Sequence, residues 1–400
     1  MTQALRTRTR LGRRHDDRDA GSATGSTEQQ PHADRRVRWP DWAPRAAAAW
    51  SLGYAALGAV WVLGGPGFPF GTANDPGAVV SILRGASPEV GAPLIVALGL
   101  AGAVVGGVMA RPSPRADAAR LVLLAFAWTA AVGLCLVVPD YRVLAATAYT
   151  PIVVLGAPFG WPPGASVLDL FPWTVLNQVV CIAGGMLWAA AAVAYQRRTR
   201  DACGACGRGQ TTPAWTTPAA AARWGRWAVA VAVVVPLVYA ATRFAWALGI
   251  PLGIDEAFYR EGQESGLWIA GAALGALAVG GAVLTLGLAQ RWGEVFPGWI
   301  PVLRGRRVPA RLVTVPASIV AVLVTMAGLM FIRLQTSGVL GDLFGFGEDS
   351  WAAIGPELLW PLWGVALGAA TLAYHYRRRG PCRRCGGDQT APPPASACPR

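Results

Sequence analysis

The chain contains eight apolar stretches, each long enough to cross a membrane as a helix. A hydrocarbon core of about 30 Å takes about 20 helical residues, and each stretch supplies about that number with few charges. The composition agrees, because 54% of the 400 residues are hydrophobic and only 14% are charged. We therefore predict an all-α integral membrane protein with spans near residues 46–65, 91–110, 119–139, 173–195, 226–250, 267–290, 312–333 and 357–376.

A sequence pattern at the end of the first half of the chain recurs at the end of the second half. Each copy has a tyrosine, several arginines and a Cys-x-x-Cys-Gly motif, and the copies are separated by a constant 179 positions (374 − 195 and 382 − 203). Residues 54–66 also match residues 239–251 at seven of thirteen positions. The motif residues are Tyr195, Cys203 and Cys206 in the first copy, and Tyr374, Cys382 and Cys385 in the second.

This duplication predicts how the spans are arranged, although similarity between apolar sequences also arises by chance. Four spans in each half give both halves the same direction through the membrane. We predict eight transmembrane helices in two parallel four-helix repeats, each ending in a cytoplasmic Cys-x-x-Cys-Gly knuckle. The predicted segments are a disordered arginine-rich tail (1–43), repeat 1 (44–207), a linker (208–222), repeat 2 (223–386) and a disordered tail (387–400).

The positions of the arginines predict the topology. Arginines gather in alternate loops and in both tails, whereas the other loops carry mainly acids, and the chain has no lysine. The positive-inside rule then places both termini and both knuckles in the cytoplasm of a bacterial cell, with the spans in its plasma membrane. Because the arginines lie beside apolar stretches, the net charge of +13 indicates membrane contact. We expect lipids as partners and no nucleic acid.

Residues 143–163 are apolar but interrupted by prolines. We expect them to lie in the outer interface or to re-enter the membrane, because a straight span does not suit them. A ninth span here would reverse the second half and contradict the arginine pattern. Their aromatic residues suit an interfacial belt or, alternatively, the lining of a lipid or apolar-substrate site.

The loop at residues 291–309 combines interfacial aromatic residues with arginines. Trp292 and Phe296 suit the membrane interface, and arginines such as Arg304 suit anionic headgroups. This loop resembles one in uncharacterised multi-pass membrane proteins of actinobacteria. The resemblance implies a multi-span plan and no known activity, so it assigns no functional residue.

Four of the seven cysteines form the two knuckles, and their spacing is typical of structural zinc. We predict that Cys203, Cys206, Cys382 and Cys385 share one Zn²⁺, because equivalent helix ends of parallel repeats can meet near the axis between them. Separate or intermolecular metal sites, a redox switch and no metal are the alternatives. A static disulfide is not expected in a reducing cytoplasm.

No catalytic motif is found, so the sequence does not indicate an enzyme. Two function classes are left. The preferred hypothesis is a small-molecule transporter or binder with a site between the repeats. The other is a structural or regulatory membrane protein that presents the zinc knuckle to a cytoplasmic partner. Asn177 and Gln178, in the outer part of the fourth span, are candidate binding residues, with interhelical hydrogen bonds as the alternative.

Arg243 is the other candidate binding residue, because it replaces Gly58 within the matching segments. An arginine in the middle of a span costs about 2.5 to 3.5 kcal/mol, so it is expected to be compensated or useful. One hypothesis is that Arg243 binds an anionic ligand in the cleft between the halves, with Gly58 leaving space opposite. The alternative is that it reaches the outer headgroups or pairs with Asp140, Asp255 or Glu256.

Overall fold

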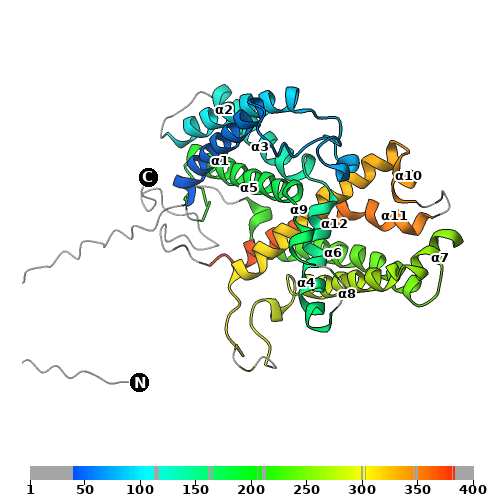
Figure 1. Ribbon diagram of the computed structural model, residues 1–400. Coiled ribbons are helices and arrows are strands. Elements are labelled where there is room, and N and C mark those ends of the chain that lie inside the picture. Colours follow the sequence, from blue (N-terminus) through cyan, green and yellow to red (C-terminus); the bar gives the residue numbers. More distant parts are fainter. Residues whose placement is uncertain are drawn as a thin grey trace, which may run out of the picture. The chain divides into compact units, whose positions relative to one another are not determined.

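The computed structural model is built from helices and the loops between them (Figure 1). The structure describes residues 39–111, 117–160, 164, 166–204, 206–209, 213–298, 301, 303–345, 347, 350–380 and 382. It is 76% helical, and the described residues contain no strand, only an isolated bridge between Val295 and Arg307. The predicted all-α class is therefore confirmed.

The helices follow one another without an intervening sheet. The α-helices are α1 (Trp39–Val62), α2 (Pro88–Ala110), α3 (Asp117–Val132), α4 (Tyr141–Gly156), α5 (Trp173–Thr199), α6 (Pro218–Ala247), α7 (Glu256–Glu264), α8 (Leu267–Leu286), α9 (Ala310–Thr336), α10 (Leu340–Phe344), α11 (Trp351–Leu358) and α12 (Trp360–Arg378). The short 3-10 segments are η1 (Pro76–Val80), η3 (Ala157–Phe159), η4 (Leu168–Leu170), η5 (Ala214–Thr216) and η6 (Arg291–Gly293), and a π-helical turn, η2 (Gly133–Val137), extends α3.

Within the described residues, seven helices are long and apolar enough to cross a membrane: α2, α3 with η2, α4, α5, α6, α8 and α9. Six of them fall on predicted spans. The other two predicted spans form α1 and α12, which are helical but less apolar because they contain tryptophan, tyrosine and glycine. The seventh, α4, forms where we did not expect a straight span. The apolar helices support a membrane-embedded protein.

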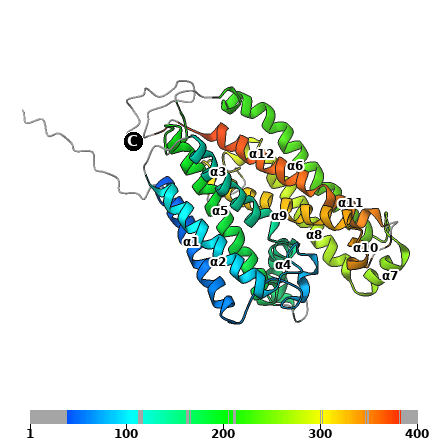
Figure 2. The same cartoon turned by 90° about the horizontal axis from the view of Figure 1, so that it is seen from above.

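Helix α4 differs from the other apolar helices in direction. In Figure 1 it runs across α6 and α8, and in the view turned by 90° in Figure 2 it is seen nearly along its axis. It packs on α9, α5 and α8. Its proline, Pro151, is accommodated inside the helix without ending it. The length and composition of α4 are those of a span, whereas its direction is that of a helix lying across the bundle.

Two helices begin earlier than the predicted segments suggest. α1 starts at Trp39, within the segment predicted as a tail, and α6 starts at Pro218, within the predicted linker. The reason for the second start is local: Thr217 caps α6 by accepting a hydrogen bond from the Ala220 amide, and Pro218 occupies the first turn. The termini at 1–38 and 383–400 lie outside the described residues.

The long helices of each half pack in corresponding pairs. α1 packs along α2 and α5, with α3 on α5, and α6 packs along α8 and α12, with α9 on α12. A glycine permits a close approach in each half, where Gly185 of α5 meets Cys135 of η2, the turn that extends α3, and Gly364 of α12 meets Thr325 of α9. A Cβ at these glycines would lie 2.5 Å and 1.9 Å from those side chains. Both approaches therefore require glycine.

An arginine near the end of the fourth long helix of each half bonds to the end of the second. Arg198 Nη2 donates to the carbonyl of Met109 at 2.6 Å, and Arg377 Nη2 donates to the carbonyl of Leu288. Donor and acceptor both differ by 179 positions between the halves (377 − 198 and 288 − 109). The offset found in the sequence thus recurs in the bonds.

The two halves contact each other along α9. This helix packs on η2 and α4 of the first half. Met326 and Ala327 of α9 are fully buried there, against Val143 of α4 and Val175 of α5. This part of the contact between the halves is an apolar core.

Candidate metal centre and buried polar groups

The first knuckle is a tight turn that follows α5. After Thr199 the chain passes through Asp201, which has a left-handed backbone with φ of 48°, and turns back on the helix. The Cys203 amide donates to the Arg208 carbonyl at 2.8 Å, and the Gly207 amide donates to the Cys203 carbonyl at 2.7 Å. Gly207 has φ of +72°, which favours glycine. The turn holds its two cysteines at one end of α5.

The second half brings a third cysteine to this turn. The Sγ atoms of Cys203, Cys206 and Cys382 all lie within 4.8 Å of one another. Cys203 is buried, and the other two are half-buried. Ligand sulfurs around a tetrahedral ion with bonds of about 2.3 Å are about 3.8 Å apart, so small movements suffice to bind an ion. The three thiols could hold a metal ion, and Cys385, the predicted fourth ligand, lies outside the described residues.

Two arginines lie beside this cysteine cluster, Cys203, Cys206 and Cys382. Arg208 is buried and its Nη2 donates to the Gly380 carbonyl at 3.1 Å, which ties the first knuckle to the chain after α12. Arg197 donates to the Gly204 carbonyl at 3.3 Å and interacts electrostatically with the cysteines of the turn. Positive charge of this kind offsets the negative charge of thiolates.

Sequence reasoning did not single out Arg197 and Arg208 as neighbours of the cysteines. Arg198 and Arg377, which belong to the arginines repeated before the two motifs, bond to helix ends instead. Arg197 lies near the cysteines because the chain reverses after α5. In that reversal the Ala202 amide donates to the Arg197 carbonyl at 2.9 Å. That reversal depends on the local backbone and not on the residue spacing.

Asn177 and Gln178 make hydrogen bonds within the first half. Asn177 is 1% exposed, and its Oδ1 accepts from the Tyr54 hydroxyl at 2.9 Å. Gln178 is 5% exposed, its Oε1 accepts from the Asp140 amide, and its Nε2 donates to Asp140 Oδ2, both at 2.9 Å. Asp140 in turn binds Arg142, which also binds Asp75 at 2.6 Å. The two amides thus join α5 to α1 and to the loops at the far end of the helices from the cysteine cluster.

Arg243 is buried in the second half, where it pairs with Glu357 of α11. Its Nη1 donates to the Ala352 carbonyl at 3.3 Å and its Nη2 to the Ala353 carbonyl at 3.4 Å. The guanidinium also lies over the rings of Tyr239 and Trp246, 4.3 Å and 4.4 Å from their centroids. α11 therefore covers Arg243 and supplies both its anion and its acceptors.

The three acids that the sequence suggested as partners of Arg243 bind other groups. Asp140 binds Arg142, Asp255 accepts from the Ser350 hydroxyl, and Glu256 pairs with Arg260. Gly58 does not face Arg243 either: a Cβ there would lie 2.9 Å from Ile95 of α2.

Glu357, the observed partner, was missed because it opens the last predicted span. Its Oε2 is buried and has no hydrogen-bond partner among the described atoms.

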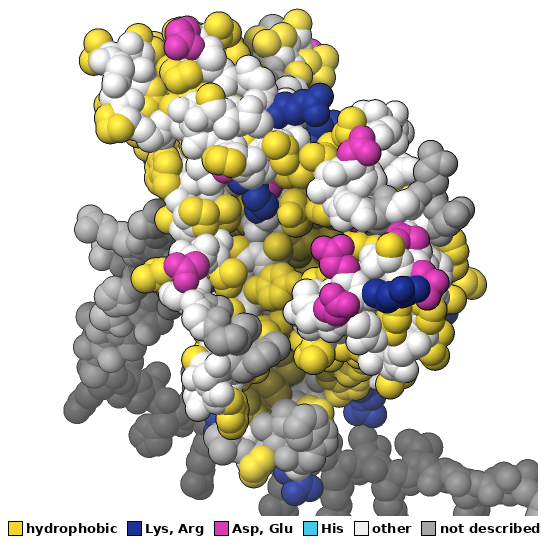
Figure 3. All heavy atoms as spheres, turned by 45° about the vertical axis from the view of Figure 1, so that its right-hand side comes forward, with side chains coloured by type: hydrophobic (Ala, Val, Ile, Leu, Met, Phe, Trp, Pro, Cys, Tyr) yellow, Lys and Arg dark blue, Asp and Glu magenta, His cyan; other side chains and the backbone are white. Residues whose placement is uncertain are grey.

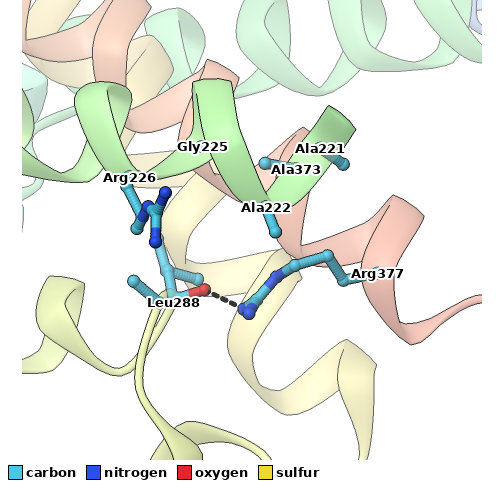
Figure 4. Close-up of a pocket in the computed structure, with 8 residues that line it drawn as sticks. Ala221, Ala222, Gly225, Arg226, Leu288, Ala373 and Arg377 are labelled. Carbon is cyan, nitrogen blue, oxygen red and sulfur yellow. Dashed lines mark hydrogen bonds between the residues drawn. The ribbon is translucent and has the colours of Figure 1, made fainter. Parts of the chain in front are cut away.

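A small pocket lies among α6, α12 and the residues that follow α8 (Figure 4). It is lined mainly by alanines and Gly225, with Arg226 and Arg377 at its edge. Arg377 points toward Leu288 and donates to its carbonyl. Such a lining offers little polar chemistry for a ligand.

Comparisons of the chain with protein-family models, with curated proteins and with solved structures give no match. The cysteine cluster and the buried Arg243–Glu357 pair are therefore interpreted from their geometry.

Proposed function

We propose that the protein is a structural or regulatory protein of the bacterial plasma membrane, in which a zinc ion joins two parallel four-helix repeats. Cys203 and Cys206 would supply ligands from repeat 1, and Cys382 and Cys385 from repeat 2. The observation that carries this proposal is that thiols from both halves lie within 4.8 Å of one another. The metal would fix how the halves are joined and would present a rigid surface to a cytoplasmic protein partner.

Three features support the repeat arrangement. The helices pair in the same order in both halves, a glycine permits the α5–α3 and α12–α9 approaches, and the Arg198 and Arg377 bonds share the offset of 179 (377 − 198). Agreement between packing, hydrogen bonds and sequence is not expected from chance similarity of apolar residues. In this proposal repeat 1 contains α1, α2, α3 and α5, and repeat 2 contains α6, α8, α9 and α12.

This assignment treats α1 and α12 as spans and α4 as a helix lying across the bundle. It gives an even number of crossings per repeat and places both cysteine pairs on one side, which the arginines mark as cytoplasmic. Figure 3 supports the opposite side as external, because acidic side chains gather on that face around few basic ones. α7 contributes Glu256, Glu261 and Glu264 there.

The chemistry of the donors supports zinc over harder cations. Thiolates select zinc, copper(I) or iron, and a tetrahedral site built from Cys-x-x-Cys pairs is typical of structural zinc. A site with four thiolates carries more negative charge than Zn²⁺ neutralises, and Arg197 and Arg208 would offset that excess. The buried position of Cys203 protects such a site from exchange with solvent.

The test is metal analysis of the purified full-length protein. We expect about one zinc per chain, lost in Cys206→Ser and in Cys382→Ser. Cys398→Ser is the matched control, because it removes a cysteine outside both motifs. Cobalt substitution should give thiolate charge-transfer absorption in the wild type. Zinc below about a tenth of an equivalent, or equal loss in the Cys398 variant, would contradict the shared site.

A second candidate function is a small-molecule binder or transporter, and the Arg243–Glu357 pair favours it. Ionisable groups inside membrane bundles are costly and often functional. Glu357 Oε2 lacks a partner, so the pair is incompletely satisfied within the described residues. An anionic ligand would replace Glu357 as the partner of Arg243. We propose an internal structural role for Asn177 and Gln178, whose amides are already bonded.

This second candidate is tested by ligand-induced stabilisation of the purified protein. Inorganic phosphate, acetate and glutamate would be added separately, with sodium chloride at matched ionic strength as the control. A rise in melting temperature with one of these anions, absent in Arg243→Gln, is the expected result. The same rise in the variant, or no rise with any anion, would rule out Arg243 as an anion-binding group for them.

A further inference from the structure

The loop between α8 and α9 forms a short hairpin with arginines on its second arm. The Phe296 amide donates to the Arg306 carbonyl at 3.0 Å, and the Gly305 amide donates to the Phe296 carbonyl at 3.1 Å. Gly305, within the second arm, has a left-handed backbone with φ of +73°, which favours glycine. We name this feature the arginine hairpin and define it as residues 294–298 and 303–308.

The base of the arginine hairpin is fixed to α12. Arg378 Nη1 donates to the Glu294 carbonyl at 2.9 Å, and its Nη2 donates to the Val308 carbonyl at 2.7 Å. One guanidinium thus holds both arms. The Tyr374 hydroxyl adds a bond of 2.7 Å to the Gly293 carbonyl. Because both arms are bonded to α12, the hairpin presents its side chains in a defined arrangement.

Among the described residues, no acid pairs with the exposed arginines of the arginine hairpin. Arg304, Arg306 and Arg307 are exposed, and none of them forms an ion pair in the part of the chain that the structure describes. Glu294, the acid at the base, lies 3.5 Å from Arg377 and is therefore already paired. Three exposed cations with defined positions and no paired acid among the described residues suit an external anionic partner.

The position of the hairpin identifies that partner. It connects α8 to α9, which are both long and apolar enough to cross a membrane, so its base lies at a membrane surface. Trp292 and Phe296 are half-buried beside it, and Val295 is 38% exposed. Apolar and aromatic side chains at the level of arginines are the pattern of a headgroup region.

We infer that the arginine hairpin is a binding site for anionic phospholipid headgroups. Arg304, Arg306 and Arg307 bind the headgroup phosphates, and Val295 and Phe296 contact the upper part of the acyl chains. Arg378 is a positioning residue, since its bonds hold the arms while its own charge faces carbonyls. The site is independent of the cysteine cluster, so it stands or falls separately from the proposed metal function.

The experiment is lipid titration of the full-length protein in detergent, followed by native mass spectrometry. Phosphatidylglycerol is the anionic probe, and phosphatidylcholine is the neutral control. The test variant is Arg306→Gln with Arg307→Gln. The matched control is Arg84→Gln with Arg260→Gln, which removes two exposed arginines from the opposite end of the bundle. Melting temperatures establish that both variants are folded.

We expect the wild type to bind phosphatidylglycerol at least tenfold more tightly than phosphatidylcholine. At about fivefold per arginine, the hairpin variant should lose more than tenfold of its affinity for phosphatidylglycerol and none for phosphatidylcholine. The control variant should bind as the wild type does. Equal affinity for the two lipids, or an equal loss in the control variant, overturns the inference. Retention of an oligonucleotide in place of lipid reassigns the hairpin to nucleic acid and equally overturns it.

Discussion

The helix pairs α1–α2 and α6–α8 occupy corresponding places in the two halves, yet they are packed in opposite ways. In the first pair the small residue is Gly58 on α1, and it faces Ile95 and Val96 of α2. In the second pair the large residue is Arg243 on α6, and it faces Gly275 of α8. Val96 and Gly275 are separated by 179 positions (275 − 96), the same offset as the knuckles. The small residue is thus on the first helix of the pair in one half and on the second helix of the pair in the other half.

This exchange shows how a buried charge fits into the second half. Gly275 gives Arg243 room, with 3.4 Å between the Arg243 Cβ and a Cβ added at Gly275. The rings of Tyr239 and Trp246 then enclose the guanidinium, and Glu357 neutralises it. The halves thus share the bonds near the cysteine cluster and differ at the opposite end. Function that is specific to one half should therefore be sought around Arg243.

The largest expected effect comes from removing the anion from this pair. Glu357→Leu leaves Arg243 buried without its carboxylate and should lower the free energy of unfolding by about 3–5 kcal/mol. The double variant Arg243→Leu with Glu357→Leu should recover most of that loss, because no unpaired charge is left. Reversible unfolding in mixed micelles measures both values.

The corresponding change in the first half is the control. Asp75→Leu removes an acid from Arg142 while Asp140 still binds that arginine through Oδ2 at 2.7 Å. Its effect should be clearly smaller than that of Glu357→Leu. If the two single variants lose equal stability, the Arg243 pair is no more critical than an ordinary pair at the end of the bundle.

The two halves also show which residues of the candidate sites could be predicted from the sequence. The sequence singled out Arg243 because it interrupts a matching segment. It singled out Cys203, Cys206 and Cys382, whose Sγ atoms lie close together in the structure, because their Cys-x-x-Cys spacing is typical of metal ligands. Glu357 was not found, because it meets Arg243 only after α11 folds over α6, 114 positions further along the chain.

The same distinction applies to the helices. Hydropathy located six of the seven apolar helices because it depends on local composition. The direction of α4 was not determined by its composition, which suits a span. Its direction depends on packing against α9, which is separated from α4 by about half of the sequence in this chain. Long-range contacts of this kind are not visible in one sequence.

A smaller effect distinguishes the two helix pairs themselves. In Gly58→Ala the new Cβ would lie 2.9 Å from Ile95, so the Ile95 side chain must shift. In Gly275→Ala the nearest atoms lie 3.4 Å from the new Cβ, which is an ordinary contact. Both changes gain the same helix propensity, so their difference isolates packing. We expect Gly58→Ala to be less stable than Gly275→Ala by about 1 kcal/mol in the same unfolding measurement. Equal stabilities would mean that the exchange of volume between the halves has no energetic consequence.

The smallest expected effect concerns the segment that holds α11 over Arg243, which has no counterpart in the first half. The Ser350 hydroxyl donates to Asp255 Oδ2 at 2.6 Å, and the Phe258 amide donates to Oδ1 at 2.9 Å. These bonds favour the carboxylate, so the pKa of Asp255 is lowered from its ordinary value, with the Ser350 bond as the main cause.

A depressed folded-state pKa contributes stability that is complete above the unfolded value of about 3.9 and is lost as the pH falls through the folded value. The protection factors of the α11 amides, which are exchange rates corrected for the intrinsic rate at each pH, should therefore fall below about pH 4 in the wild type. Asp255→Asn should remove that pH dependence, while Glu261→Asn, which changes an acid at the other end of α7, should keep it. Protection factors in α11 that are independent of pH in the wild type would show that Asp255 does not hold this cover in place.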